Sequence, residues 1–296
     1  MSKWLFNILV LPVLYLISIL PYWVIYGLSN LFYVLVYYVL GYRKDVVHEN
    51  LKRSFPEKSE AERRQIAKQF YLHFCDVFFE TLKLLTISRQ EFKRRCAMDE
   101  QSIALFHNYF EKNQTIIGVM GHCGNWEWGA VSHTVYFSRM LTGVYHPLHN
   151  KNMDKFMLDL RGRFGGDIVA MNHLYKRLLT LKQQNISTTI GLIADQTPPP
   201  ESAYWTQFMN QDTPVFNGTE KLAKKFNYPV LFLNIKKIKR GYYALSATML
   251  TEQPQDLPDG RISELHTQHL EKNIREQPYT WLWTHRRWKH NKPQTV

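Results

Sequence analysis

The chain begins with a long apolar run that constrains its fold more than any other feature. From Trp4 to Tyr42 it contains no Lys, Arg, Asp or Glu. A segment that spans a bilayer needs roughly 20 mostly apolar residues, so this run is nearly twice as long as required. It is also too long for the apolar region of a secretory signal, and no small-residue cleavage site follows it. We therefore predict that residues 1–43 form a membrane anchor.

The sequence leaves the form of this anchor open. Pro12, Pro21 and Gly27 could each interrupt a helix. A hairpin that turns near Pro21 would place Lys3 and Arg43 on the same side of the membrane, as the positive-inside rule favours. A single tilted span followed by an interfacial helix is equally compatible, and so is a monotopic anchor. The alternative is a helix buried in a soluble core, although such helices rarely continue this far without a charge.

The rest of the composition describes a folded, basic protein. With 296 residues, of which 45% are hydrophobic and 14% aromatic, the chain can bury a sizeable core. Its formal net charge of +12 favours anionic partners, namely nucleic acid, membrane phosphates or an acidic carrier protein. Its three cysteines lie far apart and form no CxxC pair, which is typical of a reducing compartment.

Behind the anchor, short apolar runs alternate with amphipathic segments. Ser59 and Glu62 have the spacing of a capping box and predict the start of a helix. We predict strands over residues 115–120, 141–145, 187–195, 230–235 and 242–249, and helices over residues 126–136, 154–163, 175–184 and 219–226. This alternation predicts an α/β domain over residues 44–296, in which helices flank a mostly parallel central sheet.

The stretch MGHCGNWEWG, residues 120–129, places an ionisable pair where a strand ends and a helix begins. Reactive groups of α/β folds gather just beyond the carboxyl ends of the strands, which is where His122 would lie. Asn125 is a suitable N-cap, so Glu127 falls in the first turn of the helix and can reach back to the imidazole. Glu127 would then hold one ring nitrogen of His122, while the other removes a proton from a substrate hydroxyl.

Other interpretations of this corner remain open. His122 alone could be a structural histidine that is hydrogen-bonded to the backbone. A catalytic thiol at Cys123 is disfavoured, because neighbours in a tight turn usually point in different directions. A metal site would need a third ligand beside His146 and His149, and the sequence does not nominate one.

Several segments, in order along the chain, resemble one known family. They are the apolar N-terminus, NLKRSFPEKSEAER from Asn50, GHCGNWEW, VYHPLHNKNMDKFMLDLRGRFGG, IADQ at 193–196, FNGTEKLAKKFNYPV and YTWLWTHRRWK. On these motifs the chain resembles the bacterial lipid A biosynthesis acyltransferases, the late acyltransferases of the lysophospholipid acyltransferase superfamily. GHCGNWEW matches the family's histidine–four-residue–acid signature, with glutamate as the acid.

The resemblance implies acyl transfer from an acyl carrier protein thioester to a hydroxyl of a lipid A precursor, without a covalent acyl-enzyme. His122 would be the general base and Glu127 its orienting partner. Neither a metal nor a cofactor is implied, since the acyl-acyl carrier protein is a co-substrate. The implied location is the bacterial inner membrane, with the catalytic domain on the cytoplasmic side.

Further residues are carried over by position. Arg163 would face a substrate phosphate or the developing oxyanion, and a surface arginine is the alternative. Asp195 would position a substrate or cap a loop. Gly218 would begin a helix whose free N–H groups could hold phosphate, or would be an ordinary cap. Asn125 and Tyr145 lie in the matched segments, and we predict that they also contact the substrate.

Two departures from the family bear on the acceptor. The family often has arginine before the proline of the Tyr-x-Pro segment, whereas this chain has His146. The glycerolipid branch usually has aspartate in the histidine–acid motif and a Glu-Gly-Thr-Arg block, whereas residues 217–220 read Asn-Gly-Thr-Glu. These differences favour a disaccharide lipid, with a lysophospholipid, another membrane lipid or an aminolipid as the alternative. A non-catalytic lipid-binding membrane protein is a further alternative.

Basic residues concentrate in two places. Each cluster could attract anionic headgroups at roughly 1 kcal/mol per residue, or dock an acidic carrier protein. Nucleic acid is disfavoured as a partner because no recognised binding module accompanies the charge. The clusters are Lys236, Lys237, Lys239 and Arg240, and Arg286, Arg287, Lys289 and Lys292.

Overall fold

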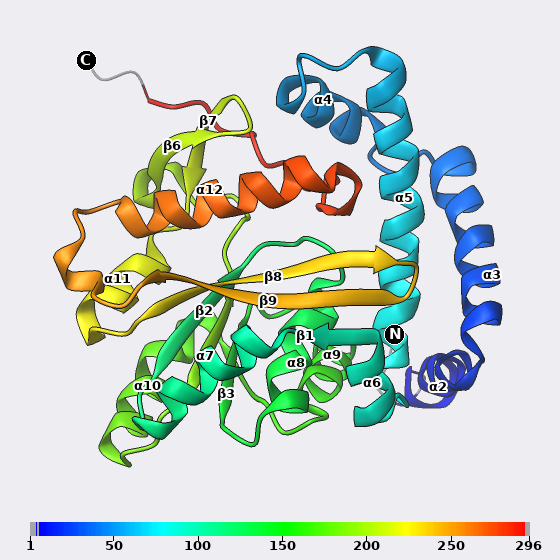
Figure 1. Ribbon diagram of the computed structural model, residues 1–296. Coiled ribbons are helices and arrows are strands. Elements are labelled where there is room, and N and C mark those ends of the chain that lie inside the picture. The colour runs from blue at the N-terminus through cyan, green and yellow to red at the C-terminus, as the bar shows by residue number, and fades with distance from the viewer. Residues whose placement is uncertain (1–3, 5, 294–296) are drawn as a thin grey trace.

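A sheet of seven strands forms the centre of the protein (Figure 1), whose computed structural model describes residue 4 and residues 6–293. The strands lie in the order β1-β9-β8-β2-β5-β3-β4, and only β8 and β9 pair antiparallel. The predicted α/β class with a mostly parallel sheet is confirmed. The strands are β1 (Cys96–Met98), β2 (Ile116–Met120), β3 (Leu141–Tyr145), β4 (Asp167–Ala170), β5 (Thr189–Ile193), β8 (Val230–Lys239) and β9 (Tyr242–Thr251).

Helices cover both faces of the sheet, and the alternating side chains of β2 show which helix covers which face. Ile116 packs with Phe106 of α7, and Met120 packs with residues of α8 and α9. Ile117, in contrast, packs with residues of α10, α11 and α12. Because successive strand residues point to opposite faces, the two groups of helices lie on opposite sides of the sheet. The helices are α4 (Lys44–Ser54), α5 (Glu60–Lys83), α6 (Arg89–Arg95), α7 (Glu100–Glu111), α8 (Trp126–Tyr136), α9 (Lys151–Gly162), α10 (Leu174–Gln183), α11 (Gly218–Phe226) and α12 (Arg261–Glu276).

Several helices and strands begin or end where the sequence predicted. The Ser59 hydroxyl accepts a hydrogen bond from the Glu62 N–H and the Glu62 carboxylate accepts from the Ser59 N–H, so the predicted capping box starts α5. Strand β3 and helix α8 have the predicted bounds. Helices α7 and α12, strand β4 and a separate hairpin of β6 (Tyr204–Phe208) and β7 (Gln211–Val215) were not predicted from the sequence. Four short 3-10 helices connect these elements: η3 (Met171–His173), η4 (Pro200–Ser202), η5 (Pro254–Asp256) and η6 (Pro278–Thr280).

The apolar N-terminal run forms four helical segments in two pairs, η1 with α2 and α3 with η2, and the pairs are separated at Pro21. Leu20 is extended, as expected for a residue before proline, and α3 begins directly afterwards. By length and composition, Tyr22–Val39 is the one helix of the described residues that could cross a membrane, with a mean hydropathy of 1.3 and 22% of it buried. The segments are η1 (Phe6–Val10), α2 (Leu11–Ile19), α3 (Tyr22–Tyr33) and η2 (Val34–Val39).

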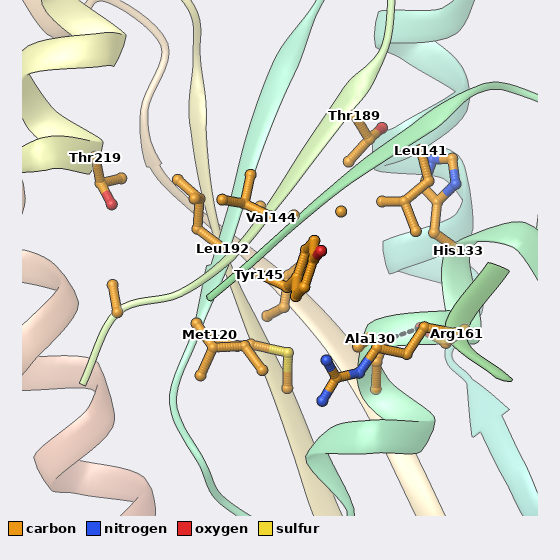
Figure 2. Close-up of a pocket in the computed structure, with 18 of the residues that line it drawn as sticks. Met120, Ala130, His133, Leu141, Val144, Tyr145, Arg161, Thr189, Leu192 and Thr219 are labelled. Carbon is orange, nitrogen blue, oxygen red and sulfur yellow. Dashed lines mark hydrogen bonds between the residues drawn. The ribbon is translucent and has the colours of Figure 1, made fainter. Parts of the chain in front are cut away.

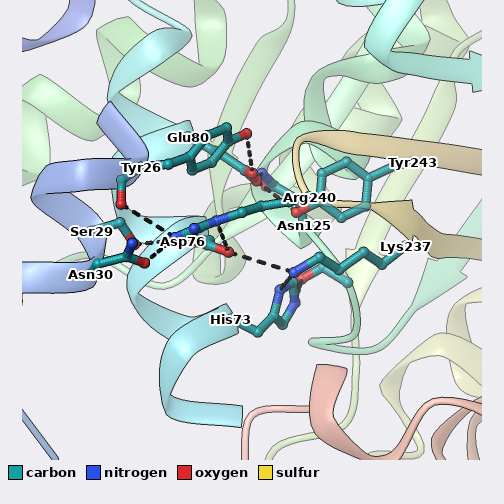
Figure 3. A network of polar contacts seen from close by, with 11 residues as sticks. Tyr26, Ser29, Asn30, His73, Asp76, Glu80, Asn125, Lys237, Arg240 and Tyr243 are labelled. Carbon is teal, nitrogen blue, oxygen red and sulfur yellow. Dashed lines mark hydrogen bonds and ion pairs between the residues drawn. The ribbon is translucent and has the colours of Figure 1, made fainter. Parts of the chain in front are cut away.

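Polar contacts fasten the middle of α3 to the rest of the protein (Figure 3). The Ser29 hydroxyl donates to the buried Asp76 carboxylate of α5 over 2.7 Å. Arg240, in the turn between β8 and β9, forms an ion pair with the same carboxylate at 2.6 Å and donates to the Asn30 side chain over 2.8 Å. One helical turn further along α5, the hydroxyl of Tyr26 donates to the carboxylate of the buried Glu80 over 3.0 Å. Three elements far apart in sequence are therefore joined at one buried acidic centre.

Some residues of the two predicted basic clusters are paired or buried in the structure. Lys237 and Arg240 both pair with Asp76 and are not freely available to an anionic partner. Arg287 of the second cluster is 1% exposed, and burial lowers its pKa to about 10 although the nearby Asp195 opposes this. These three members of the two clusters are therefore paired or buried, and the predicted attraction of an anionic partner falls to the other members.

Candidate active site

The corner between β2 and α8 presents His122 at the carboxyl edge of the sheet. Asn125 caps α8 as predicted, since its side-chain oxygen accepts from the Trp128 N–H over 3.0 Å. Gly124 has a φ of +56°, and a Cβ at this position would lie 2.4 Å from the Ile235 carbonyl oxygen. Only glycine fits both the backbone conformation and this close approach. The turn therefore has a fixed shape, and the side chain of His122 remains 16% exposed.

Asp195, just beyond the end of β5, holds the imidazole of His122. One carboxylate oxygen lies 2.5 Å from Nδ1 of His122. The other accepts from the His122 backbone N–H over 2.7 Å and from Nε1–H of Trp281 over 2.8 Å. Strands β2 and β5 are parallel neighbours, so their carboxyl ends bring the two residues together. Asp195 thus makes three contacts, two with His122 and one with Trp281, and it does not line the cavity beside this corner.

This pairing sets the protonation of both groups. Burial disfavours the charged imidazole, but the Asp195 carboxylate outweighs burial and raises the pKa of His122. Burial also opposes ionisation of Asp195, but His122 and the hydrogen bonds outweigh it and lower the pKa of the carboxyl. Because an ionised carboxylate can only accept, Nδ1 carries the proton and Nε2 is left as the basic nitrogen. The pair can therefore accept a proton from a hydroxyl placed at Nε2.

Glu127 does not hold the imidazole, so this part of the prediction is corrected. Both of its carboxylate oxygens accept from Arg161 of α9, over 2.6 Å from Nη2 and 2.9 Å from Nε. Such a two-point contact fixes the guanidinium plane and leaves Nη1 without a role in the pair. Arg161 was not among the predicted site residues, because the family motif in this segment points to Arg163. A signal for Arg161 was present in the sequence. Asp154 and Arg161 lie seven residues apart on α9, and that spacing places the two opposite charges on one face of the helix.

A cavity of about 590 Å³ opens beside these groups (Figure 2). His122, Glu127 and Arg161 line it, together with mostly apolar residues from β2, β3, β5, β8, β9 and α8. Part of the cavity follows the face of the sheet that α8 covers, and Leu174 and Leu222, from helices on the opposite face, line another part. The site therefore combines a charged entrance with an apolar interior, which is the arrangement expected for a ligand with a polar head and an apolar tail.

Three glycines create the space along the sheet. Gly118 of β2, Gly191 of β5 and Gly143 of β3 are direct neighbours in the strand register, and all three line the cavity. Glycine within a strand often marks a place where a ligand approaches the backbone closely. A row of three glycines leaves β2, β5 and β3 without side chains of their own at this level, where Leu233, Leu141 and Ile168 approach the backbone.

The structure divides the remaining predicted residues into two groups. Tyr145 and Gly218 line the cavity, the first from the end of β3 and the second from the first turn of α11. Arg163 does not line it, since its guanidinium donates to the Leu84 carbonyl and its side chain lies over Phe164. Asn125 is fully buried and donates to Glu80 over 2.7 Å. Neither Arg163 nor Asn125 lines the cavity, and substrate contact by these two residues stays a prediction.

The structure also bears on two other interpretations of this corner, a thiolate nucleophile at Cys123 and a metal site near His146 and His149. Cys123 is buried, and burial raises its pKa well above the usual value, which opposes a role as thiolate nucleophile. His146 lines the cavity, whereas His149 is exposed and does not line it. Within the described part of the chain, no group of three His, Cys, Asp or Glu residues could hold a metal ion.

The fold and the site together define an α/β protein in which a paired imidazole lies beside a largely apolar cavity. The chain matches the family model of bacterial lipid A biosynthesis acyltransferases over residues 1–290. It therefore belongs to this family and is an acyltransferase, so the predicted resemblance is confirmed. Among curated proteins, no relative matches the chain.

Proposed function

We propose that this enzyme transfers a fatty acyl chain from an acyl carrier protein thioester to a hydroxyl of a lipid A precursor. The observation that carries this proposal is the His122–Asp195 pair at the entrance of the apolar cavity. The cavity would take the acyl chain, and its charged entrance would take the reacting groups. Family membership supports lipid A biosynthesis as the setting.

The proposed reaction needs no nucleophile from the protein. Nε2 of His122 accepts the proton of the acceptor hydroxyl while the hydroxyl oxygen attacks the thioester carbonyl. The tetrahedral intermediate collapses, an ester C–O bond replaces the C–S bond, and the imidazolium returns its proton to the leaving thiolate. Asp195 stabilises the imidazolium between these two transfers and keeps Nδ1 protonated.

Arg161 is the best-placed positive charge for this reaction. Glu127 holds its Nε and Nη2, and the side chain lines the cavity next to His122. The guanidinium can therefore face the developing oxyanion or an acceptor phosphate without moving first. In this proposal Glu127 acts through Arg161 as a positioning residue. The phosphate site predicted at Gly218 is less favourable, because the buried Glu220 carboxylate lies in the same helical turn.

A substrate matrix tests this function directly. The purified enzyme in mixed micelles is given acyl-acyl carrier protein or acyl-coenzyme A, each with a lipid A precursor or a lysophospholipid. We expect transfer only with the carrier protein and the lipid A precursor. Acylation of the lysophospholipid alone would favour the alternative acceptor. Transfer to neither acceptor, with headgroup binding retained, would favour a non-catalytic lipid-binding protein.

The lipid profile of a deletion strain adds an independent readout. We expect lipid A that lacks one acyl chain and unchanged phospholipids, as measured by mass spectrometry. Intact lipid A with altered phospholipids or aminolipids would contradict the proposed acceptor.

We also propose that the N-terminal helices lie in one leaflet of the inner membrane and do not cross it. The contacts of Ser29 and Asn30 with Asp76 and Arg240 lie in the middle of the only candidate span among the described residues. A crossing helix would carry those charged groups into the hydrocarbon, at a cost of roughly 2.5–3.5 kcal/mol or more for each charge. The opposite side of these helices is apolar and exposed, with Trp23 78% exposed and Leu31 69%.

Cysteine labelling tests this topology. All three native cysteines are buried, so an impermeant thiol reagent will have a low background. Reporter cysteines at Asn7 and Lys44 should react on the same side of sealed vesicles, the cytoplasmic side. Trp23→Ser combined with Leu31→Ser should release the protein into a carbonate wash, whereas the exposed surface change Lys52→Ser should not. A hairpin that crosses the membrane also leaves both ends on one side. A third reporter cysteine at Pro21 therefore distinguishes such a hairpin from helices that lie in one leaflet. Labelling of Pro21→Cys from the opposite side would contradict the proposal.

A further inference from the structure

Two buried polar side chains face the inner end of the cavity without a hydrogen-bond partner among the described residues. They are His133 of α8, with both ring nitrogens, and Thr189 of β5, with its hydroxyl. His133 is 5% exposed and Thr189 is 1% exposed. Buried polar groups are nearly always hydrogen-bonded, so two orphans that line one cavity need an explanation. Figure 2 labels both residues, together with Leu141, on the same side of the cavity.

The surroundings of the two groups offer no partner of their own. The imidazole of His133 packs against the rings of Phe106 and Phe137, with centroids 5.8 Å and 5.2 Å away. Burial lowers the pKa of His133 to about 3, so at neutral pH the ring has one N–H donor and one acceptor nitrogen. Thr189 lies opposite Leu141 of β3 in the strand register. Both orphans could therefore donate and accept, but only toward the cavity.

The strand register gives their depth. On β5, the cavity lining runs from Ile193, two residues before the Asp195 that contacts His122, across Gly191 to Thr189. Four residues of strand correspond to about 13 Å. On α8, His133 lies six residues after Glu127, about 9 Å further along the helix axis. An extended alkyl chain advances roughly 1.3 Å per carbon, from its bond length and staggered torsions, so the strand distance from Ile193 to Thr189 corresponds to about ten carbons and the helix distance from Glu127 to His133 to about seven.

We propose that this polar level binds a hydroxyl group carried far along the acyl chain, about ten carbons from the thioester. The inference rests on the proposed function, because it assumes that the cavity holds the acyl chain. A hydroxyl at this depth can accept from the N–H of His133 and donate to Thr189, or the reverse. A plain chain that passes the same level excludes water and leaves both groups unsatisfied, which disfavours it.

Paired acyl donors test this inference. The acyl carrier protein is loaded with a saturated chain or with the same chain bearing a hydroxyl at about carbon 10, the depth given by the strand rise. We expect wild-type protein to transfer the hydroxylated chain roughly tenfold more efficiently, the size of one well-made buried hydrogen bond. A hydroxyl on the β-carbon, close to the thioester, should give no such preference.

Three variants locate the effect. Thr189→Val and His133→Leu should each bring the ratio of the two transfer rates close to one. The matched control is Thr188→Val, one residue earlier, whose hydroxyl already contacts Thr142 over 2.9 Å and which does not line the cavity. It should keep the wild-type ratio even if it destabilises the fold, because a ratio is independent of the amount of folded enzyme.

Fatty-acid binding separates failure of this inference from failure of the proposed function. The Kd values of the two free fatty acids are measured by thermal shift on wild-type protein and on the double variant Thr189→Val, His133→Leu. Tighter binding of the hydroxylated acid by wild type alone supports the polar site even if no transfer to lipid A occurs. Equal affinities in wild type, as expected if a buried water satisfies both groups, would overturn it. So would a preference that persists in the double variant.

Discussion

Replacing His122 with glutamine lowers acyl transfer by roughly 100- to 10,000-fold, the usual contribution of a general base. Glutamine fills a similar space and can still contact Asp195 through its amide, but it has no basic nitrogen at neutral pH. The loss should appear in kcat more than in KM, because the proton transfer is made only in the transition state. Initial rates with acyl-acyl carrier protein and lipid A precursor measure it.

The matched control for this change is His149→Gln. His149 is exposed and does not line the cavity, so this variant should transfer at the wild-type rate. Near-normal transfer by the His122→Gln variant would remove His122 from the reaction, whatever the identity of the acceptor.

Replacing Asp195 with asparagine has an effect of similar size through a different cause. One carboxylate oxygen accepts from two donors, the His122 backbone N–H and the Trp281 indole. The amide oxygen of asparagine must keep those contacts, so its NH₂ group faces Nδ1 of His122. Nδ1 then has to accept, which moves the ring proton to Nε2 and removes the base. Where an aspartate orients a catalytic histidine in this way, the tautomer change costs up to roughly 10,000-fold in kcat.

The pH dependence distinguishes this orienting role from a structural one. His122 must be neutral to act, and Asp195 raises its pKa. Wild-type kcat/KM should therefore fall as the pH drops through a value above that of a free histidine. In Asp195→Asn the carboxylate is lost but burial remains, so the acid limb of the residual activity should move to lower pH.

Glu127→Gln is the matched comparison. Glu127 also raises the pKa of His122, but Arg161 opposes this and Asp195 is the larger influence. In the Glu127→Gln variant, the acid limb of the pH dependence of kcat/KM should therefore move less than in Asp195→Asn. An unchanged limb in Asp195→Asn, or a larger shift in Glu127→Gln, would restore Glu127 as the orienting acid. Thermal unfolding of both variants checks that they fold.

The sequence by itself predicted the features that depend on neighbouring residues. The capping box at Ser59, the N-cap at Asn125 and the bounds of β3 and α8 follow from side-chain types at fixed spacings. The family motif around His122 is also local. Such signals are reliable because the interacting groups lie within a few residues of one another in the same helix or strand.

Only the tertiary structure decided which side chains meet at the site. Asp195 reaches His122 across 73 residues because β5 lies next to β2, and Arg161 reaches Glu127 across 34 because α9 packs beside α8. The contacts that hold α3 on Asp76 and Arg240 span 47 and 210 residues. Apolar periodicity identifies a strand or helix but carries no information on its neighbour in space. The partner of the catalytic histidine, the depth of the cavity and the seating of the N-terminal helices therefore depend on strand order and helix packing.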